Sequence, residues 1–89
     1  MIEQDLKIIN RLGIHARPAA LIAQTAAGFS CEIQISKDNL TVDAKSIMGV
    51  MMLAAECGST IHVLTRGADE QEAADALKKL VENKFNEEF

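Results

Sequence analysis

The chain has 89 residues, of which 48% are hydrophobic and 3% aromatic, and its formal net charge of −4 is acidic. This size suits one domain over residues 1–89, while the acidic charge and the scarcity of aromatic rings argue against a nucleic-acid partner. No apolar run approaches a membrane span and the first residues lack the features of a signal peptide, so we expect a cytoplasmic protein without membrane insertion.

The first two elements are a strand and a helix. Apolar and polar residues alternate over residues 2–8, which predicts a strand with one buried face. A helix is expected over residues 16–27, because Pro18 suits a first helical turn and Gly28 is a typical stop. Its core-facing stripe is predicted to contain Ala19, Ile22, Ala23 and Ala26. The opposite stripe consists of small residues that could admit a partner surface, together with one amide: Ala16, Ala20, Gln24 and Ala27.

The middle of the chain is expected to contain a hairpin and a short helix. Residues 31–36 alternate as a strand, and the turn-forming residues 37–39 lead into a second strand over residues 40–43. A short helix is predicted over residues 46–54, with Ser46 near its start. Two isolated cysteines, which lack the spacing of metal ligands or of a redox motif, are expected to be small packing residues: Cys31 and Cys57.

A further strand is predicted around Ile61 and Val63, ending near Gly67, and it is followed by the most strongly patterned helix. Asp69 and Glu72 have the spacing of a capping box at the start of that helix. Its buried stripe is expected to consist of Ala73, Leu77, Leu80 and Val81. The element order is β-α-β-β-α-β-α, which favours an α+β open-faced sandwich with all helices on one face of a single sheet.

The octapeptide at residues 13–20 carries the strongest indication of chemistry. It places His15 just before the expected helix start, where free backbone N–H groups and the helix dipole favour an anion such as a phosphoryl group. A neutral imidazole is also a nucleophile, so the same geometry could hold a covalent phosphohistidine. Arg17 could pair with phosphate oxygens through two hydrogen bonds. On these residues alone, His15 could still be a surface or capping residue and Arg17 a solvated one.

Two motifs carry a resemblance to a known family. They are Gly13-Ile14-His15-Ala16-Arg17-Pro18-Ala19 and Lys45-Ser46-Ile47-Met48-Gly49-Val50-Met51. In a chain of this length they resemble the HPr family, the histidine phosphocarrier proteins of the bacterial phosphoenolpyruvate-dependent phosphotransferase system. The resemblance covers essentially the whole chain. It implies a four-stranded antiparallel sheet covered on one face by three helices.

The resemblance also implies what the residues of the first motif do. His15 would take a phosphoryl group from phosphorylated enzyme I and pass it to a histidine of an enzyme IIA-type protein, and the family uses the Nδ1 nitrogen. Arg17 would stabilise the transferred phosphate. The chain would then be a stoichiometric phosphocarrier and not an enzyme, acting as a monomer with no metal and no cofactor.

For Ser46, two compatible interpretations stand side by side. Serine is a preferred N-cap residue, and the second motif implies regulatory phosphorylation by an HPr kinase. A phosphate at a helix start is tolerated by the fold, and its charge would repel an acidic partner surface.

Partner docking is expected on the two motif helices. A helix over residues 46–54 cannot bury all its apolar side chains, so we expect some methionines to be exposed, above all Met48 and Met52. The family docks its partners through such an apolar patch, which here would consist of Met48, Met51 and Met52 beside Ala16, Ala20 and Gln24. Seven of the thirteen acidic residues lie between Asp69 and Glu88, whereas three basic residues near the motifs suggest a positive docking face: Arg11, Arg17 and Lys45.

Two alternatives remain open beside the sugar-transport carrier. Leu12 stands where sugar-transport members commonly carry a small polar residue, and this segment is closer to members that include the regulatory nitrogen-related branch, so the choice between the two branches stays open. A regulatory adaptor of the same fold that does not transfer phosphate is disfavoured, because such relatives lack the active histidine. A metal-binding domain has no ligand cluster to support it, and His62, on a strand among apolar residues, is expected to be structural.

Overall fold

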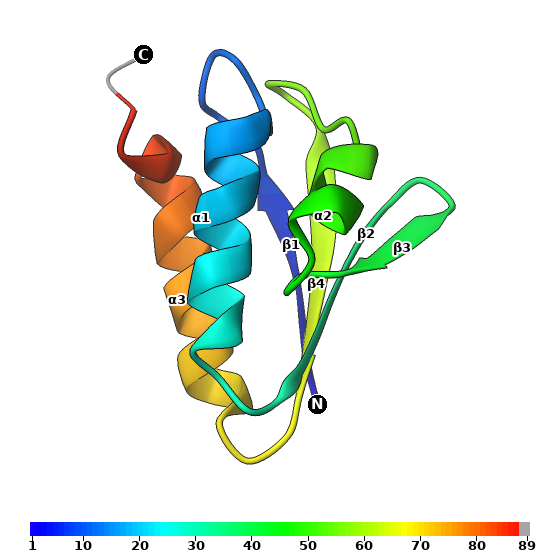
Figure 1. Cartoon of the computed structure of the whole chain (residues 1–89), viewed down its shortest axis with the longest axis vertical. Coiled ribbons are helices and arrows are strands. Elements are labelled where there is room, and N and C mark those ends of the chain that lie inside the picture. The colour runs from blue at the N-terminus through cyan, green and yellow to red at the C-terminus, as the bar shows by residue number, and fades with distance from the viewer. Residues whose placement is uncertain (88–89) are drawn as a thin grey trace.

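The computed structural model describes residues 1–87, so Glu88 of the acidic run and Phe89 lie outside the described residues. Figure 1 shows the elements, and a short 3₁₀ turn over Lys84–Asn86 follows the last helix. In chain order they are β1 (Ile2–Lys7), α1 (Ala16–Ala27), β2 (Glu32–Lys37), β3 (Leu40–Asp43), α2 (Ile47–Met52), β4 (Thr60–Arg66) and α3 (Glu70–Glu82). Within residues 1–87 no helix has both the length and the apolar character needed to cross a membrane.

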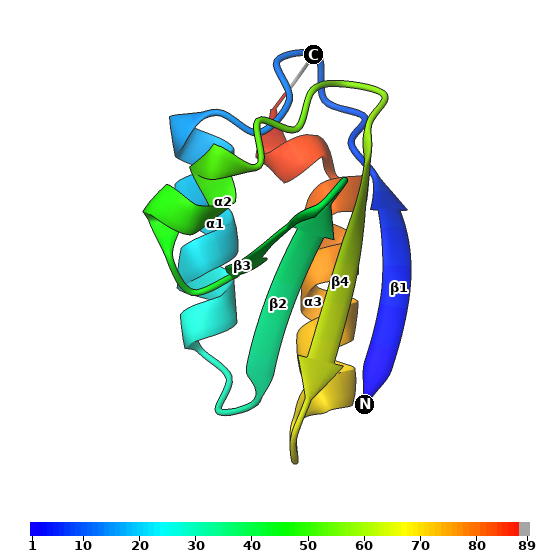
Figure 2. The same ribbon diagram turned by 90° about the vertical axis from the view of Figure 1, so that its right-hand side faces the viewer.

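The four strands form one antiparallel sheet in the order β1-β4-β2-β3. All three helices lie on one face of this sheet, and Figure 2 shows the other face uncovered. The predicted fold, an open-faced sandwich with the order β-α-β-β-α-β-α, is confirmed. This arrangement follows from the strand pattern, because alternate side chains of each strand point to opposite faces and only one face is apolar.

The core lies between the sheet and the helices. β2 and β4 contribute two buried aliphatic residues each. The predicted core-facing stripes of α1 and α3 pack against these residues. Of those stripes, Leu80 alone is only half-buried. The residues that meet in this layer include Ile33, Ile35, Ile61, Val63, Ala19, Ile22, Ala26, Ala73, Leu77 and Val81. Because this layer fixes α1 against the sheet, it also fixes the residues at the start of α1.

The bounds of α1 and the predicted hairpin are confirmed. α1 runs from Ala16 to Ala27, with Gly28 as the C-cap. A two-residue loop joins β2 to β3, and Asp38 in this loop has a φ of 57°. Such loops favour positive φ because the turns that it produces match the right-handed twist of the flanking strands. Aspartate tolerates that conformation better than most residues.

The predicted capping box at α3 is wrong. Asp69 is the N-cap residue, but its carboxylate makes no cap hydrogen bond. Instead the carboxylate accepts from the backbone N–H groups of Ser30 (2.9 Å) and Cys31 (3.0 Å), which ties the start of β2 to the start of α3. These bonds, led by the one from Ser30, hold the pKa of Asp69 below its ordinary value. A contact between residues so far apart in the sequence outcompetes the local cap.

Two environments also differ from the prediction. Cys31 is buried as expected, but Cys57 is exposed, because residues 54–59 form a surface loop. His62 does not lie among apolar side chains: it points to the uncovered face of the sheet. Its Nδ1 lies 2.8 Å from a carboxylate oxygen of Asp5, and its Nε2 lies 2.9 Å from one of Glu3.

These two carboxylates give a testable pH dependence. The hydrogen bonds to Asp5 and then Glu3 raise the pKa of His62 above its ordinary value near 6.5. The stabilisation is therefore fully present below about pH 6.5 and is lost as the pH rises through the raised pKa. We expect the difference in free energy of unfolding between the wild type and His62→Gln, measured in urea, to shrink between pH 6 and pH 9. Because the groups are exposed, it should stay below about 1 kcal/mol per pair. A difference that grows with pH would contradict this assignment.

Candidate functional site

His15 is the N-cap residue of α1, and the loop before it is held by backbone contacts. Its φ of −104° and ψ of −165° are extended, and its side chain makes no cap hydrogen bond. Just before it, Ile14 N–H donates to the carbonyl of Ala55 (2.8 Å). Gly13 has a φ of 69°, and a Cβ there would lie only 2.5 Å from the same carbonyl oxygen. Glycine is therefore needed for this close approach, which sets the position of His15.

The start of α1 provides a positive end beside the imidazole. In an α-helix the first backbone N–H groups, here those of Ala16 and Arg17, have no partner inside the helix. The helix dipole adds the equivalent of about half a positive charge at this end. Pro18 has no N–H to leave unpaired and is buried. The site can therefore stabilise an anion near His15 at its surface, by about 0.3–1 kcal/mol.

A carboxylate from the far end of the described chain lies against the imidazole. Glu87 Oε2 lies 2.9 Å from His15 Nε2, and Glu87 Oε1 accepts from Asn10 Nδ2 at 2.8 Å. The Glu87 side chain is only 6% exposed, whereas that of His15 is 39% exposed. Burial alone would raise the pKa of Glu87, but the hydrogen bonds from Asn10 and His15 and the charge of Arg17 outweigh it and lower the pKa. Glu87 is therefore an ionised carboxylate at neutral pH.

The ionised carboxylate determines which ring nitrogen carries the hydrogen. A carboxylate only accepts hydrogen bonds, so the hydrogen in the contact with Glu87 belongs to Nε2 of His15. In the neutral ring, Nδ1 is then the nitrogen with a free lone pair. The neutral ring of His15 therefore carries its hydrogen on Nε2 and has a free lone pair on Nδ1.

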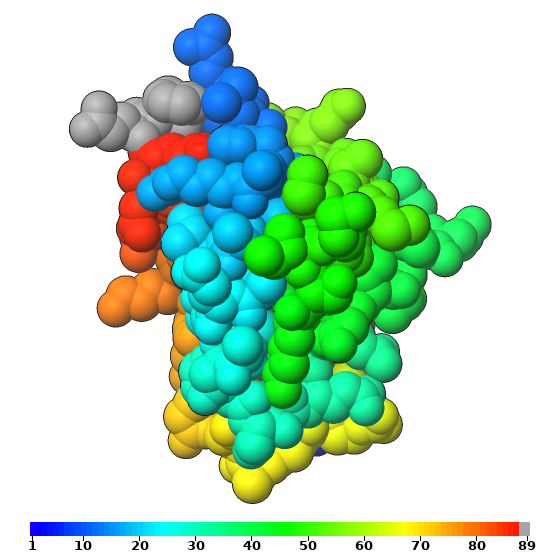
Figure 3. All heavy atoms as spheres, viewed as in Figure 1, coloured from blue at the N-terminus to red at the C-terminus, as the bar shows by residue number. Residues whose placement is uncertain are grey.

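The segment after α3 brings Glu87 to this position through a left-handed turn. Lys84, Phe85 and Asn86 have φ values of 55°, 54° and 63°. Phe85 is fully buried, and its carbonyl oxygen accepts from the Arg17 guanidinium at 2.9 Å. The same guanidinium nitrogen lies 3.8 Å from Glu87 Oε2. In Figure 3 this red segment lies against the blue start of α1.

Ser46 lies where the sequence predicts it, at the N-cap of α2. Its hydroxyl oxygen accepts from the backbone N–H of Gly49 at 3.1 Å. Lys45 beside it points away from His15, because its ammonium donates to the carbonyl of Phe29 at 2.8 Å, just beyond the other end of α1. Twelve helical residues separate the two ends, about 18 Å. The expectation that Lys45 joins Arg17 in one basic cluster is therefore wrong.

The predicted docking residues lie side by side on α1 and α2, which pack against each other. Met48 and Met52 are 71% and 65% exposed, as expected, and Met51 is 40% exposed. On α1, Ala16 and Gln24 are exposed and Ala20 is half-buried. Figure 3 shows green α2 beside blue α1 on this face of the molecule. The exposed faces of these two helices, which include the predicted docking residues, are called the α1–α2 surface.

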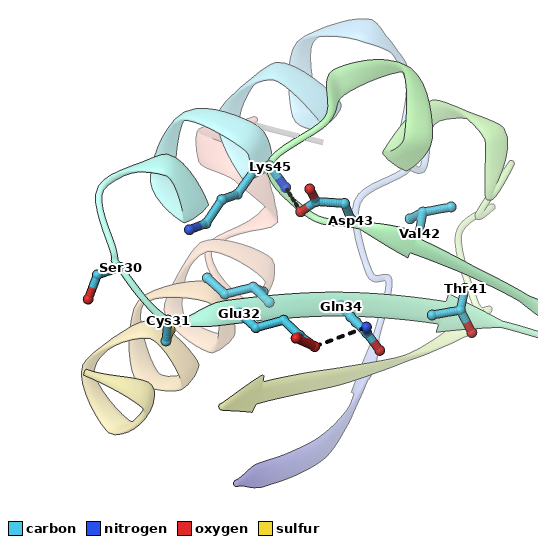
Figure 4. Close-up of a pocket in the computed structure, with 9 residues that line it drawn as sticks. Ser30, Cys31, Glu32, Gln34, Thr41, Val42, Asp43 and Lys45 are labelled. Carbon is cyan, nitrogen blue, oxygen red and sulfur yellow. Dashed lines mark hydrogen bonds between the residues drawn. The ribbon is translucent and has the colours of Figure 1, made fainter. Parts of the chain in front are cut away.

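A separate pocket of about 470 Å³ lies beside β2 (Figure 4). Residues 30–34, residues 41–43 and Lys45 line it, so it contains neither His15 nor Arg17. Several of its polar groups are already paired within the protein. The carboxylate of Glu32 accepts from Arg66 and Gln34, and Lys45 is bound as described above. This pocket is therefore separate from the site around His15.

Sequence reasoning missed two residues of the site, Glu87 and Asn10. Glu87 lies 72 positions from His15, and nothing in its spacing relates it to the motif. Asn10 lies in the connection before the motif and looks like an ordinary loop residue. No local pattern in the sequence distinguishes Asn10 from the other residues of this loop.

Comparisons with known proteins agree with this geometry. The family profile PTS-HPr, described as "PTS HPr component phosphorylation site", matches residues 2–83. The phosphocarrier protein HPr of Cupriavidus necator is 53% identical over 98% of each chain, and that of Treponema pallidum is 48% identical over 99% of this chain and 100% of its own. The crystal structure of HPr-C-His from Thermoanaerobacter tengcongensis covers 100% of both chains with 49% identity and a TM-score of 0.95. The chain belongs to the HPr family of phosphocarrier proteins of the phosphotransferase system.

Proposed function

We propose that His15 accepts a phosphoryl group on Nδ1 from phosphorylated enzyme I and passes it to an enzyme IIA-type protein. The observation that carries this proposal is the contact between His15 Nε2 and the buried carboxylate of Glu87, which leaves Nδ1 unprotonated beside the start of α1. In this family, enzyme I receives its phosphoryl group from phosphoenolpyruvate, so we propose that the chain acts in the cytoplasm.

The transfer step needs no general base. The lone pair of Nδ1 forms a bond to phosphorus while the bond between phosphorus and the donor atom of enzyme I breaks, and its electron pair returns to the donor. The hydrogen on Nε2 stays in place, so the ring of phosphorylated His15 becomes positively charged. Glu87, at 2.9 Å from Nε2, stabilises that charge. Transfer to the acceptor runs the same step in reverse.

Exposure suits a carrier that has to release its cargo. The imidazole is 39% exposed, and a surface helix start stabilises an anion by only about 0.3–1 kcal/mol. A buried cage of donors would bind the phosphoryl group too tightly to pass it on. The modest stabilisation therefore supports reversible transfer in both directions.

The direct test is phosphorylation of the purified chain. Incubation with enzyme I, Mg²⁺ and phosphoenolpyruvate should add one phosphoryl group that is stable in base and labile in acid, and ³¹P–¹⁵N coupling should assign it to Nδ1 of His15. Purified IIA-type proteins should then remove it. A chain that takes up no phosphoryl group from active enzyme I would overturn the proposal.

Arg17 is proposed to bind the phosphoryl oxygens. Its guanidinium is half exposed, and it would exchange the carbonyl of Phe85 for the incoming phosphate. We expect Arg17→Ala to lower the rate of phosphotransfer about tenfold to a hundredfold, the equivalent of one hydrogen bond to a charged group. Rapid-quench transfer kinetics measure this, with Arg66→Ala, whose guanidinium pairs with Glu32, as the control. Wild-type rates for Arg17→Ala would remove Arg17 from the reaction.

The α1–α2 surface is proposed to dock enzyme I and the acceptor. Its members are those predicted from the sequence, and methionines adapt to several partners because their side chains are flexible and polarisable. The proposed docking residues are Ala16, Ala20, Gln24, Met48, Met51 and Met52.

Regulation at Ser46 by an HPr kinase is proposed to act on docking, because Ser46 is the N-cap of α2, which contributes to the α1–α2 surface. Ser46→Asp should raise the apparent KM of enzyme I for the chain, and the defect should weaken as ionic strength rises. Ser46→Ala should lower the free energy of unfolding by about 0.5–2 kcal/mol, since the bond from Gly49 N–H is lost, with transfer near normal. Steady-state transfer assays and urea denaturation measure the two effects. Equal KM values for the two variants would leave Ser46 as a helix cap alone.

Two finer points belong to the same proposal. The exposed Leu12 favours the nitrogen-related branch, and the IIA-type protein that drains phosphate fastest from His15 distinguishes it from the sugar-transport branch. The chain is proposed to act as a monomer, because one chain supplies every residue of the site: His15, Arg17, Glu87 and Asn10. The HPr dimer of Thermoanaerobacter tengcongensis, 49% identical over 98% of this chain with a TM-score of 0.79, makes light scattering the appropriate check.

A further inference from the structure

Asn10 is a buried amide that joins two separate parts of the site. Its side chain is fully buried, and Thr65 is the other buried polar residue among the described residues. The two hydrogens of its Nδ2 are directed to two acceptors, the carbonyl of Gly13 (2.7 Å) and Oε1 of Glu87 (2.8 Å). The first bond closes the loop that leads to His15, and the second holds the segment that contacts its ring. One NH₂ group therefore holds the loop before His15 and the segment that ends at Glu87 in a fixed relative position.

Stability alone does not explain an amide at this position. Within residues 1–87, no group donates a hydrogen bond to Asn10 Oδ1. A buried oxygen without a donor costs about 1–3 kcal/mol, a cost that an apolar side chain of similar size would avoid. The NH₂ half of the side chain is the part that makes contacts, and both contacts belong to the site.

Asn10 also positions the carboxylate that meets the imidazole. Both oxygens of an ionised carboxylate can only accept hydrogen bonds. Asn10 Nδ2 holds Oε1 of Glu87, and this leaves Oε2 directed at His15 Nε2. Asn10 thus acts on His15 through Glu87 without touching the ring.

We propose that Asn10 is a positioning residue for phosphotransfer, which acts through Glu87 to keep the hydrogen of His15 on Nε2 and so keeps Nδ1 free to accept the phosphoryl group. The inference rests on the proposed function for the identity of Nδ1 as the accepting atom. Its structural part concerns the tautomer of His15, which can be measured without any phosphotransfer partner.

The sharpest test replaces the carboxylate by an amide. In Glu87→Gln, the Nδ2 group of Asn10 still donates to the side-chain oxygen of residue 87, so the new NH₂ group is turned toward His15 Nε2. That group donates to Nε2 and moves the hydrogen of the neutral ring to Nδ1. The ¹⁵N spectrum of histidine-labelled protein above pH 8 should therefore show Nε2–H in the wild type and Nδ1–H in Glu87→Gln. The rate constant of phosphorylation by enzyme I should fall about tenfold to a hundredfold, as for other lost catalytic geometry.

The second variant tests Asn10 itself by a double-mutant cycle. In the wild-type background, Asn10→Ala should slow phosphorylation, mainly through kcat with little change in KM. In the Glu87→Gln background, the same substitution frees the new amide to turn its oxygen to Nε2. There it should raise the rate and restore Nε2–H. This change of sign cannot arise from a residue that only stabilises the fold.

A matched control is Thr65→Val, which removes the bond from the other buried polar side chain to the carbonyl of Glu70, at 3.0 Å. It should lower the melting temperature while leaving both the ¹⁵N pattern and the rate unchanged. The inference is overturned if Glu87→Gln keeps Nε2–H, or if Asn10→Ala lowers the rate by the same factor in both backgrounds. A wild-type chain with the expected ¹⁵N pattern but no phosphorylation would instead refute the proposed function and leave the tautomer result standing.

Discussion

His15→Ala is expected to abolish phosphorylation while the chain stays folded. The imidazole is 39% exposed and makes no cap hydrogen bond, so α1 loses little when it is removed. The main structural cost is the buried Glu87 carboxylate, which loses one donor, at about 1–3 kcal/mol. That is a fraction of the 5–15 kcal/mol typical of a domain.

The measurement is acid-labile label incorporated from phosphoenolpyruvate by enzyme I, with circular dichroism to confirm folding. His62→Ala is the matched control, because His62 is the second of the two histidines of the sequence and lies on the uncovered sheet face. It should take up label at the wild-type rate. Label that persists in His15→Ala and disappears in His62→Ala would move the phosphoacceptor to the sheet.

Phe85→Ala should have the largest effect on stability and should disturb the site as well. Phe85 is fully buried, and truncation of a core phenylalanine typically costs about 3–5 kcal/mol. In a chain of this length the melting temperature should fall by more than about 12 °C. Residues 84–86 hold positive φ values that this anchor maintains, so its loss should also release Glu87 from His15 and the Phe85 carbonyl from Arg17.

Thermal denaturation and the ¹⁵N spectrum of His15 report these two effects separately. Phe29→Ala serves as the control, because Phe29 is only partly buried and lies at the other end of α1. It should cost less stability and leave the His15 ring unchanged. A fall in melting temperature for Phe85→Ala no larger than that for Phe29→Ala would show that Phe85 does not anchor the segment.

The elements that sequence reasoning predicted correctly are those that depend on local pattern. Periodicity and the terminal signals placed α1, and the turn residues placed the hairpin at Asp38. The helix-start signal also placed His15 at the N-cap of α1 and Arg17 in its first turn, while their roles in phosphotransfer stay predictions. Exposure of Met48 and Met52 followed from the number of apolar residues that one short helix can bury.

The predictions that failed, or were not made, concern contacts between distant residues. Asp69 has the spacing of a local cap, yet its carboxylate binds the backbone at Ser30 and Cys31, which only the folded sheet brings near. Glu87 reaches His15 because Phe85, a residue without local preference for positive φ, is held in that conformation by burial. Tertiary packing overrides local preference at both places, and no spacing rule within the sequence encodes it.

The meeting of Asn10, His15 and Glu87 has a consequence for how the protein is made. The segment that ends at Glu87 supplies the carboxylate that contacts the imidazole of His15 and the amide of Asn10. While the chain is being synthesised, the motif at residues 13–20 therefore emerges from the ribosome long before the residues that orient its imidazole. Nascent chains should therefore carry an exposed histidine whose tautomer is not fixed until Glu87 has left the exit tunnel. The orientation of the imidazole is thus set later in synthesis than the motif that carries it.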